Sequence, residues 1–174
     1  MAEITLILGG CRSGKSRYAL EHAEARGERR KIFLATCQAF DPEMENRIAA
    51  HQRERGPGWV TVEEPVDLPG ALQRESRDSS LIVLDCLTLW VSNLLQEGRS
   101  EERIMEGFQE LAEALRDAAG NILVVSNEVG QGIVPDNPMS RQFRDLVGWL
   151  NQRIAATADR VVWTVAGIPV TVKG

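Results

Sequence analysis

Residues 9–16 of this chain, GGCRSGKS, match the complete Gly-x-x-x-x-Gly-Lys-Ser pattern of a phosphate-binding loop, or P-loop. The pattern has this meaning only between a buried strand and the start of a helix. Both flanks are present: residues 4–8 (ITLIL) form a short aliphatic run of strand type, and residues 15–25 are helical in pattern and rich in Ala and Glu. The match predicts a strand–loop–helix unit rather than a glycine-rich turn of purely structural use.

The residue types of the loop indicate its chemistry. Its glycines let the backbone curl without a Cβ clash, so that successive N–H groups can point at phosphate oxygens, and the following helix adds its partial positive charge. Lys15 is expected to bridge the β- and γ-phosphates, and Ser16 to ligate Mg²⁺. We therefore predict a nucleoside triphosphate site made by Gly9, Gly10, Cys11, Arg12, Ser13, Gly14, Lys15 and Ser16.

Apolar runs of strand type alternate with amphipathic segments along the whole chain. After the P-loop unit we expect strands at 31–35, 59–63, 81–85 and 121–126, and helices at 41–55, 67–77, 87–95, 101–119 and 138–158. Residues 160–166 and 170–172 are expected to close the chain as a hairpin around 167–169, with at least one antiparallel strand. Repeated strand–helix units predict a mainly parallel sheet with helices on both faces, in one domain over residues 1–174.

Composition excludes several classes of protein. The formal net charge is −5 and the pI is near 5.2, which gives no global electrostatic reason to bind nucleic acid. No 18 apolar residues run together, so we expect no membrane span, and the start of the chain lacks the pattern of a signal peptide. Three cysteines without close pairing are typical of reduced thiols, which favours the cytoplasm.

Side chains with possible roles follow several of the expected strands. Asp85 ends strand 81–85, where P-loop proteins place the acidic residue on the Mg²⁺ side, although a solvated carboxylate or a helix cap is the alternative. The three cysteines Cys11, Cys37 and Cys86 also lie at strand ends. We expect alkylation of these thiols to impair nucleotide binding, and bound nucleotide to protect the thiols from alkylation. The alternative, which we weigh equally, is that each cysteine is a small buried apolar side chain without a role in binding.

A P-loop alone leaves ATPase, GTPase switch, kinase and transferase open. The chain lacks the Asn-Lys-x-Asp motif by which switch GTPases read the base, and its 174 residues leave little room for a motor ATPase. Of its two histidines, His22 is expected to be a solvated surface residue. His51 is followed by Gln-Arg-Glu-Arg, and a neutral imidazole there could attack phosphorus while Arg53 and Arg55 stabilise phosphate charge. A structural or solvated histidine is the alternative.

Several longer motifs follow one another along the chain in the same order as in one known protein family. They are Ala-Thr at 35–36, Asp-x-Glu-Met-x-x-Arg-Ile-x-x-His at 41–51, Asn-Glu-Val-Gly-x-Gly-Ile-Val-Pro at 127–135, and Arg-Gln-Phe-Arg-Asp at 141–145, followed by Asn-Gln-Arg at 151–153. With the P-loop they resemble the bifunctional adenosylcobinamide kinase / adenosylcobinamide-phosphate guanylyltransferase family of cobalamin biosynthesis. The resemblance spans nearly the whole chain, and the 127–135 block and the helix of His51 are its narrowest signals.

The resemblance implies a RecA-like P-loop fold and two reactions. The family phosphorylates the aminopropanol hydroxyl of adenosylcobinamide and then transfers GMP from GTP to that phosphate through a guanylylated histidine, which corresponds to His51. It also implies a corrinoid substrate, GTP, ATP and Mg²⁺ as ligands, and a homotrimer with substrate near a subunit boundary. Beyond the P-loop, the nucleotide site implied by the resemblance comprises Ala35, Thr36, Cys37, Gln52, Arg53, Glu54, Arg55, Glu63 and Asp85.

Some features depart from the family pattern or leave a role open. Cys11 and Cys37 stand where alanine and serine are common, and Ala50 leaves His51 as the one candidate nucleophile where some relatives have two histidines. The 127–135 block is either a structural turn or a substrate-facing loop, in which Glu128 is the one carboxylate that could take a proton from the substrate hydroxyl. A kinase without a covalent intermediate and a non-catalytic switch module remain the alternative functions.

Overall fold

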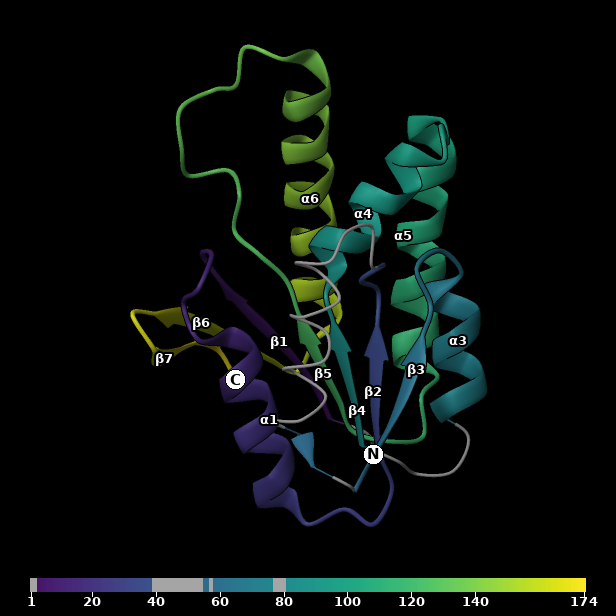
Figure 1. Ribbon diagram of the computed structural model, residues 1–174, viewed down its shortest axis with the longest axis vertical. Coiled ribbons are helices and arrows are strands. Elements are labelled where there is room, and N and C mark those ends of the chain that lie inside the picture. Colours follow the sequence, from purple (N-terminus) through teal and green to yellow (C-terminus); the bar gives the residue numbers. More distant parts are fainter. Residues whose placement is uncertain (1–2, 39–54, 57, 77–80) are drawn as a thin grey trace.

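A seven-stranded sheet forms the centre of the computed structural model, which describes residues 3–38, 55–56, 58–76 and 81–174 (Figure 1). Most strands are short runs of aliphatic residues whose side chains are largely buried, as expected for strands covered on both faces. Their positions agree with the predicted ones to within a few residues. The strands are β1 (Ile4–Gly9), β2 (Lys31–Ala35), β3 (Trp59–Glu63), β4 (Leu81–Asp85), β5 (Ile122–Val125), β6 (Arg160–Val165) and β7 (Ile168–Lys173).

The lateral order of the strands is β3-β2-β4-β5-β1-β6-β7. The first six are mutually parallel, and β7 pairs antiparallel with β6. β5 therefore lies between β4 and β1, although it follows both in the chain. Because parallel strands end at the same edge of a sheet, the segments that follow β1, β2, β4 and β5 meet at one edge, which we call the carboxyl edge.

Helices cover both faces of the sheet (Figure 1). Ile7, Phe33 and Val83 pack with Ala19 of α1 (Lys15–Arg26) on one face. Their strand neighbours Leu6, Leu34 and Leu84 point to the other face, because side chains alternate along a strand. The helices that cover this second face are α3 (Leu68–Glu75), α4 (Leu87–Gln96), α5 (Glu101–Arg116) and α6 (Pro138–Thr157). This arrangement confirms the predicted three-layer α/β fold.

The ends of some helices differ from the prediction. α5 ends at Arg116 instead of residue 119, because the chain turns at Asp117 and Ala118 to enter β5. α3 begins after Asp67, whose carboxylate accepts a hydrogen bond from the Gly70 N–H at 3.1 Å and so caps the helix. Most of the predicted helix 41–55 lies outside the described residues. No described helix combines the length and the apolar character that crossing a bilayer requires.

The terminal hairpin is confirmed, but its turn is shorter and earlier than predicted. Ala166 and Gly167 form a two-residue turn with φ values of 50° and 82°, as hairpin turns of the primed types require. Ile168 and Pro169, predicted to be loop, are the first residues of β7. A proline is tolerated there because β7 is an edge strand that pairs only with β6.

Candidate functional site

The P-loop connects β1 to α1 at the carboxyl edge and surrounds a cavity of about 340 Å³. Gly14 caps the helix with a left-handed φ of 94°, a conformation that favours glycine. Gly9 has no space for a side chain, since a Cβ there would lie 2.4 Å from the Thr164 hydroxyl oxygen. The described residues that line the cavity are Arg12, Ser13, Gly14, Lys15, Ser16, Arg17 and Leu20. Five of the eight predicted loop residues therefore line it, and Gly9, Gly10 and Cys11 do not.

Lys15 is the buried cation of this loop, with 8% of its surface exposed. Its Nζ donates a hydrogen bond to the Gly10 carbonyl oxygen at 2.6 Å. Burial lowers the pKa of the Lys15 ammonium, and the nearby Asp85 carboxylate only partly offsets this effect. A largely buried ammonium within a phosphate-binding loop is suited to bind phosphate oxygens.

Ser16 and Asp85 are 69 residues apart in the chain but meet at the carboxyl edge. The Ser16 hydroxyl donates to Asp85 Oδ2 at 2.6 Å. In the described part of the chain, no three His, Cys, Asp or Glu side chains gather into a metal site of their own. A hydroxyl and a carboxylate nevertheless fit Mg²⁺, which is commonly held by one or two protein oxygens together with phosphates and waters.

The residues after β2 line the same edge, but not all of them can touch a ligand. Ala35 and Cys37 are half-buried there, whereas Thr36 is fully buried. The Thr36 hydroxyl donates to the Cys86 carbonyl oxygen at 2.7 Å and accepts from the Cys86 N–H at 2.9 Å. Thr36, predicted to line the nucleotide, therefore joins the ends of β2 and β4 instead of presenting its side chain to the site.

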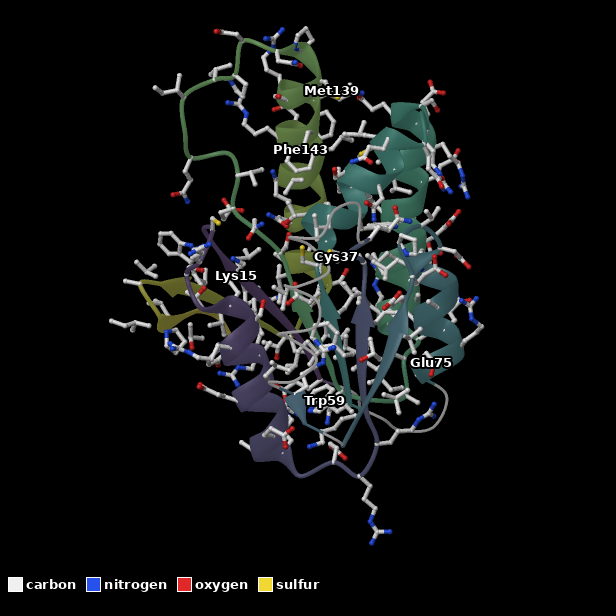
Figure 2. The ribbon with its side chains drawn as sticks, in the orientation of Figure 1. Lys15, Cys37, Trp59, Glu75, Met139 and Phe143 are labelled. Carbon is white, nitrogen blue, oxygen red and sulfur yellow. The ribbon has the colours of Figure 1, made fainter. Side chains whose placement is uncertain are left out.

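The remaining predicted residues spread further along the sheet. Glu63 is exposed at the end of β3, four strand spacings from β1, or about 19 Å at roughly 4.8 Å per spacing. Arg55 is 9% exposed and lies 3.7 Å from the centre of the Phe33 ring, over the middle of β2 rather than at its carboxyl end. His51, Gln52, Arg53 and Glu54 lie outside the described residues. Figure 2 shows Lys15 and Cys37 toward the carboxyl edge and Trp59 at the opposite end of the sheet.

Sequence reasoning did not identify the residues of the terminal hairpin that hold the P-loop. Thr164 of β6 is 2% exposed, and its hydroxyl donates to the Leu8 carbonyl oxygen at 3.1 Å. Its oxygen lies 2.8 Å from Ser13 Oγ, and the Gly167 N–H donates to the Ser13 carbonyl oxygen at 2.9 Å. No local pattern marks these contacts, because more than 150 residues separate Ser13 from Thr164.

Replacing Thr164 by valine should weaken binding of Mg²⁺–GTP by about 30-fold. The change keeps the shape but removes two hydrogen bonds at the P-loop, each with a net contribution of about 1 kcal/mol. Titration calorimetry measures the affinity, and Thr164→Ser should restore it. Thr171→Val, an exposed position on β7 of the same hairpin, is the matched control. An unchanged affinity in Thr164→Val would show that the hairpin does not position the loop.

The three cysteines should react with iodoacetamide in order of exposure. Cys11 is exposed, Cys37 is half-buried and Cys86 is buried, where desolvation raises the pKa of its thiol to about 12. Because the thiolate is the reactive form, Cys86 should stay unmodified at pH 8 while Cys11 reacts first, with loss of nucleotide binding and protection by Mg²⁺–GTP. Mass spectrometry of the folded protein measures this order. Modification of Cys86 as fast as Cys11 would contradict it.

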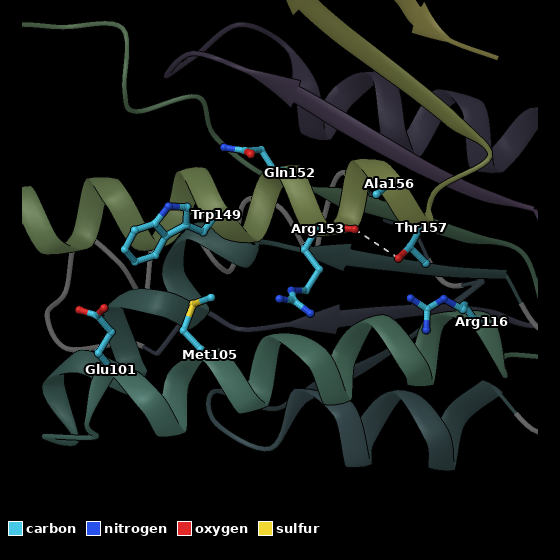
Figure 3. A pocket seen from close by; sticks show the side chains of 8 residues that line it. All are labelled: Glu101, Met105, Arg116, Trp149, Gln152, Arg153, Ala156 and Thr157. Carbon is cyan, nitrogen blue, oxygen red and sulfur yellow. Dashed lines mark hydrogen bonds between the residues drawn. The ribbon is translucent and has the colours of Figure 1, made fainter.

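A second cavity, larger than the one at the P-loop, lies elsewhere on the described part of the chain. A groove of about 770 Å³ runs between α5 and α6, on the face of the sheet opposite α1 (Figure 3). Trp149, Gln152 and Arg153 of α6 line it from one side, and Glu101, Met105 and Arg116 from the other. It shares no lining residue with the described P-loop cavity, so cavity size does not identify the nucleotide site.

Comparisons with known proteins identify relatives of the chain. The family model described as cobinamide kinase / cobinamide phosphate guanyltransferase matches residues 5–172. The bifunctional adenosylcobalamin biosynthesis protein CobP of Pseudomonas aeruginosa is 45% identical over 97% of this chain and 96% of its own. CobU of Escherichia coli, with the same description, is 36% identical over 97% of this chain and 98% of its own.

A solved structure supports the fold alone. The ATPase EscN of an Escherichia coli type III secretion system superimposes with a TM-score of 0.57 and 14% identity, over 95% of this chain and 43% of that one. This likeness agrees with the predicted RecA-like P-loop fold and its mainly parallel sheet.

Proposed function

The chain belongs to the cobinamide kinase / cobinamide phosphate guanyltransferase family, and from that premise we propose that its P-loop site serves two consecutive reactions. In the first, the terminal phosphate of ATP or GTP passes to a hydroxyl of adenosylcobinamide. In the second, GMP from GTP passes to that phosphate, and pyrophosphate leaves. The observation that carries the proposal is the meeting of Ser16 and Asp85 at 2.6 Å beside Lys15, which is the arrangement that a triphosphate needs.

Different groups of the site are proposed to bind different parts of the Mg²⁺–triphosphate complex. The N–H groups of the P-loop and the N-terminus of α1 bind phosphate oxygens, and the Lys15 ammonium neutralises charge that grows on them as the terminal phosphate is transferred. Ser16 and Asp85 would hold Mg²⁺, which would neutralise phosphate charge when bound. With the triphosphate at β1, the nucleoside extends along the carboxyl edge toward β4, β2 and Glu63 on β3.

We propose His51 as the nucleophile of the second reaction. Its imidazole nitrogen attacks the α-phosphorus of GTP, so that a P–N bond forms while the bond to the β-phosphate breaks and pyrophosphate leaves. A phosphate oxygen of adenosylcobinamide phosphate then attacks the same phosphorus and regenerates the free imidazole. The resemblance of residues 41–51 to the family supports this assignment, as does the capacity of a neutral imidazole for covalent catalysis. Gln52, Arg53 and Glu54 are proposed to line the nucleotide beside it.

The broader setting of the reaction is also a proposal. The substrate is proposed to be a corrinoid, and the protein to be a cytoplasmic homotrimer with substrate bound near a subunit boundary. The family membership supports the substrate class, and the role of the relatives in adenosylcobalamin biosynthesis supports the pathway. Light scattering on the purified protein tests the trimer.

GTP labelled at two positions tests the two-step reaction. With cobinamide present, label at the γ-phosphate should appear in cobinamide phosphate, and label at the α-phosphate should appear in the GDP-linked product. Without an acceptor, α-label should remain on the denatured protein as an acid-labile, base-stable adduct. A kinase without a covalent intermediate would transfer only γ-label, and a switch module would transfer neither.

A further inference from the structure

We propose that Glu128 is the general base of the phosphorylation step and that Asn151 positions it. The inference rests on the proposed kinase reaction and adds the group that takes the proton from the substrate hydroxyl. Its starting point is the lateral order of the strands, which places the end of β5 between Asp85 at the end of β4 and the P-loop at the end of β1.

The backbone around Glu128 is held on both sides. The Glu128 N–H donates to the Gly9 carbonyl oxygen at 3.1 Å, which continues the pairing of β5 with β1 into the first residue of the P-loop. On the other side, the Asn127 N–H donates a hydrogen bond to the Thr88 hydroxyl oxygen at 2.8 Å. The backbone of Glu128 is therefore held beside Gly9, the first residue of the P-loop.

The carboxylate of Glu128 is also held in place, by a hydrogen bond from a neutral amide and not by a cation. Asn151 of α6 is 4% exposed, and its Nδ2 donates to Glu128 Oε1 at 3.0 Å and to the Asn127 carbonyl oxygen at 3.0 Å. Within the described parts of the chain, Glu128 has no ion pair, and its other carboxylate oxygen receives no hydrogen bond. A half-exposed carboxylate held by a neutral amide keeps an oxygen available to accept a proton.

Two other described carboxylates lie at strand ends on this edge, and neither is both near the P-loop and available to accept a proton. Asp85 accepts from Ser16 on the proposed Mg²⁺ side, and Glu63 lies on the far strand β3. Glu128 is thus the described carboxylate at this edge that is both close to the P-loop and available.

The chemistry of the step requires such a group. As the substrate oxygen forms its bond to the γ-phosphorus, the bond from the γ-phosphorus to the β-phosphate oxygen breaks and the nucleoside diphosphate leaves. The O–H bond of the substrate breaks in the same step, and its proton passes to the Glu128 carboxylate and then to water. Attack by His51 on the α-phosphorus involves no substrate hydroxyl, so it does not need this base.

The test is a comparison of both half-reactions in Glu128→Gln. The turnover for cobinamide phosphorylation should fall by about 10²-fold, at the lower end of the range for general-base catalysis. The affinity for Mg²⁺–GTP and the retention of α-label without acceptor should stay within about twofold, because the amide keeps the shape and the backbone bond to Gly9. The acidic limb of the wild-type pH–rate profile should disappear in the variant.

Two further variants complete the design. Asn151→Ala should lower the phosphorylation turnover by about tenfold, with an unchanged KM for cobinamide and with the acidic limb retained. Glu28→Gln is the matched control: Asn121 Nδ2 donates to Glu28 Oε1 at 3.1 Å, the same pair of residue types at the opposite end of β5. That variant should phosphorylate cobinamide at the wild-type rate.

The outcomes separate this inference from the proposed function. Wild-type phosphorylation rates in Glu128→Gln would overturn the role of Glu128 while leaving the kinase reaction intact. A parallel loss of GTP affinity and α-label would also overturn it, since Glu128 would then belong to nucleotide binding. Failure of the wild-type protein itself to phosphorylate cobinamide would instead refute the proposed function.

Discussion

Replacing Lys15 by methionine should reduce both half-reactions by on the order of 10³-fold. The substitution keeps the length of the side chain but removes the buried ammonium that we propose to contact the phosphates. The affinity for Mg²⁺–GTP should fall with the activities, and calorimetry measures it. Folding stability should not fall in parallel, because burial lowers the pKa of the Lys15 ammonium.

The sign of that stability effect follows from linkage. A lysine whose pKa is lower in the folded state than in the unfolded state opposes folding at neutral pH, and this cost disappears as the pH rises toward the unfolded value. The methionine variant lacks the cost, so without nucleotide it should unfold at a urea concentration at least as high as the wild type. A variant that loses stability and binding together would show that Lys15 holds the loop rather than the ligand.

Lys31→Met is the control, for which we expect the opposite effects on folding stability and on GTP affinity. Lys31 begins β2 at the far end of the sheet, where its Nζ lies 2.5 Å from a Glu24 carboxylate oxygen and 5.5 Å from the centre of the Trp59 ring. Its loss should lower stability slightly and leave the GTP affinity unchanged.

Replacing His51 by alanine should abolish the covalent adduct with GMP and lower guanylyl transfer by on the order of 10⁴- to 10⁶-fold, as removal of a nucleophile does in other enzymes. Phosphorylation of cobinamide should continue, because that step uses the γ-phosphate and needs no covalent intermediate. In the wild type, labelling should decline as the pH falls through the imidazole pKa, which is about 6.5 when unperturbed, since only the neutral ring attacks phosphorus.

His22 is the natural control, because the chain has two histidines. It lies on α1 against Tyr18, with ring centres 5.7 Å apart, and burial together with Arg26 lowers its pKa. His22→Ala should retain the α-label in full. Label that persists in His51→Ala, or that increases toward pH 5, would exclude His51 as the nucleophile.

Much of the fold was predictable because its signals are local. A strand such as β4 is recognisable from its unbroken aliphatic run, and the start of α3 from Asp67 followed by Pro69. The predicted ends of helices were wrong where tertiary contacts determine them. For example, α5 ends earlier than predicted because the chain turns there to enter β5. The hairpin turn was misplaced because Pro169 suggests a loop, whereas the edge position of β7 allows proline within the strand.

The candidate site was predictable only in part. The P-loop could be identified because consecutive residues carry its entire chemistry. The burial of Thr36 could not, since it depends on which strand lies beside β2. Nor could the contact of Arg55 with the Phe33 ring, which joins residues 22 positions apart in the chain. The Asn151 contact with Glu128 likewise joins α6 to the end of β5 and has no sequence signal.

The sequence by itself determined the phosphate-binding loop, the alternation of strands and helices, and the presence of acidic and thiol side chains at strand ends, because each of these is encoded in a few neighbouring residues. Only the tertiary structure decided that β5 lies between β4 and β1, that Ser16 meets Asp85, and that Thr164 and Gly167 hold Ser13. The physical reason is that lateral strand order depends on burial and pairing summed over distant segments, to which no short stretch of sequence contributes enough to specify the neighbour.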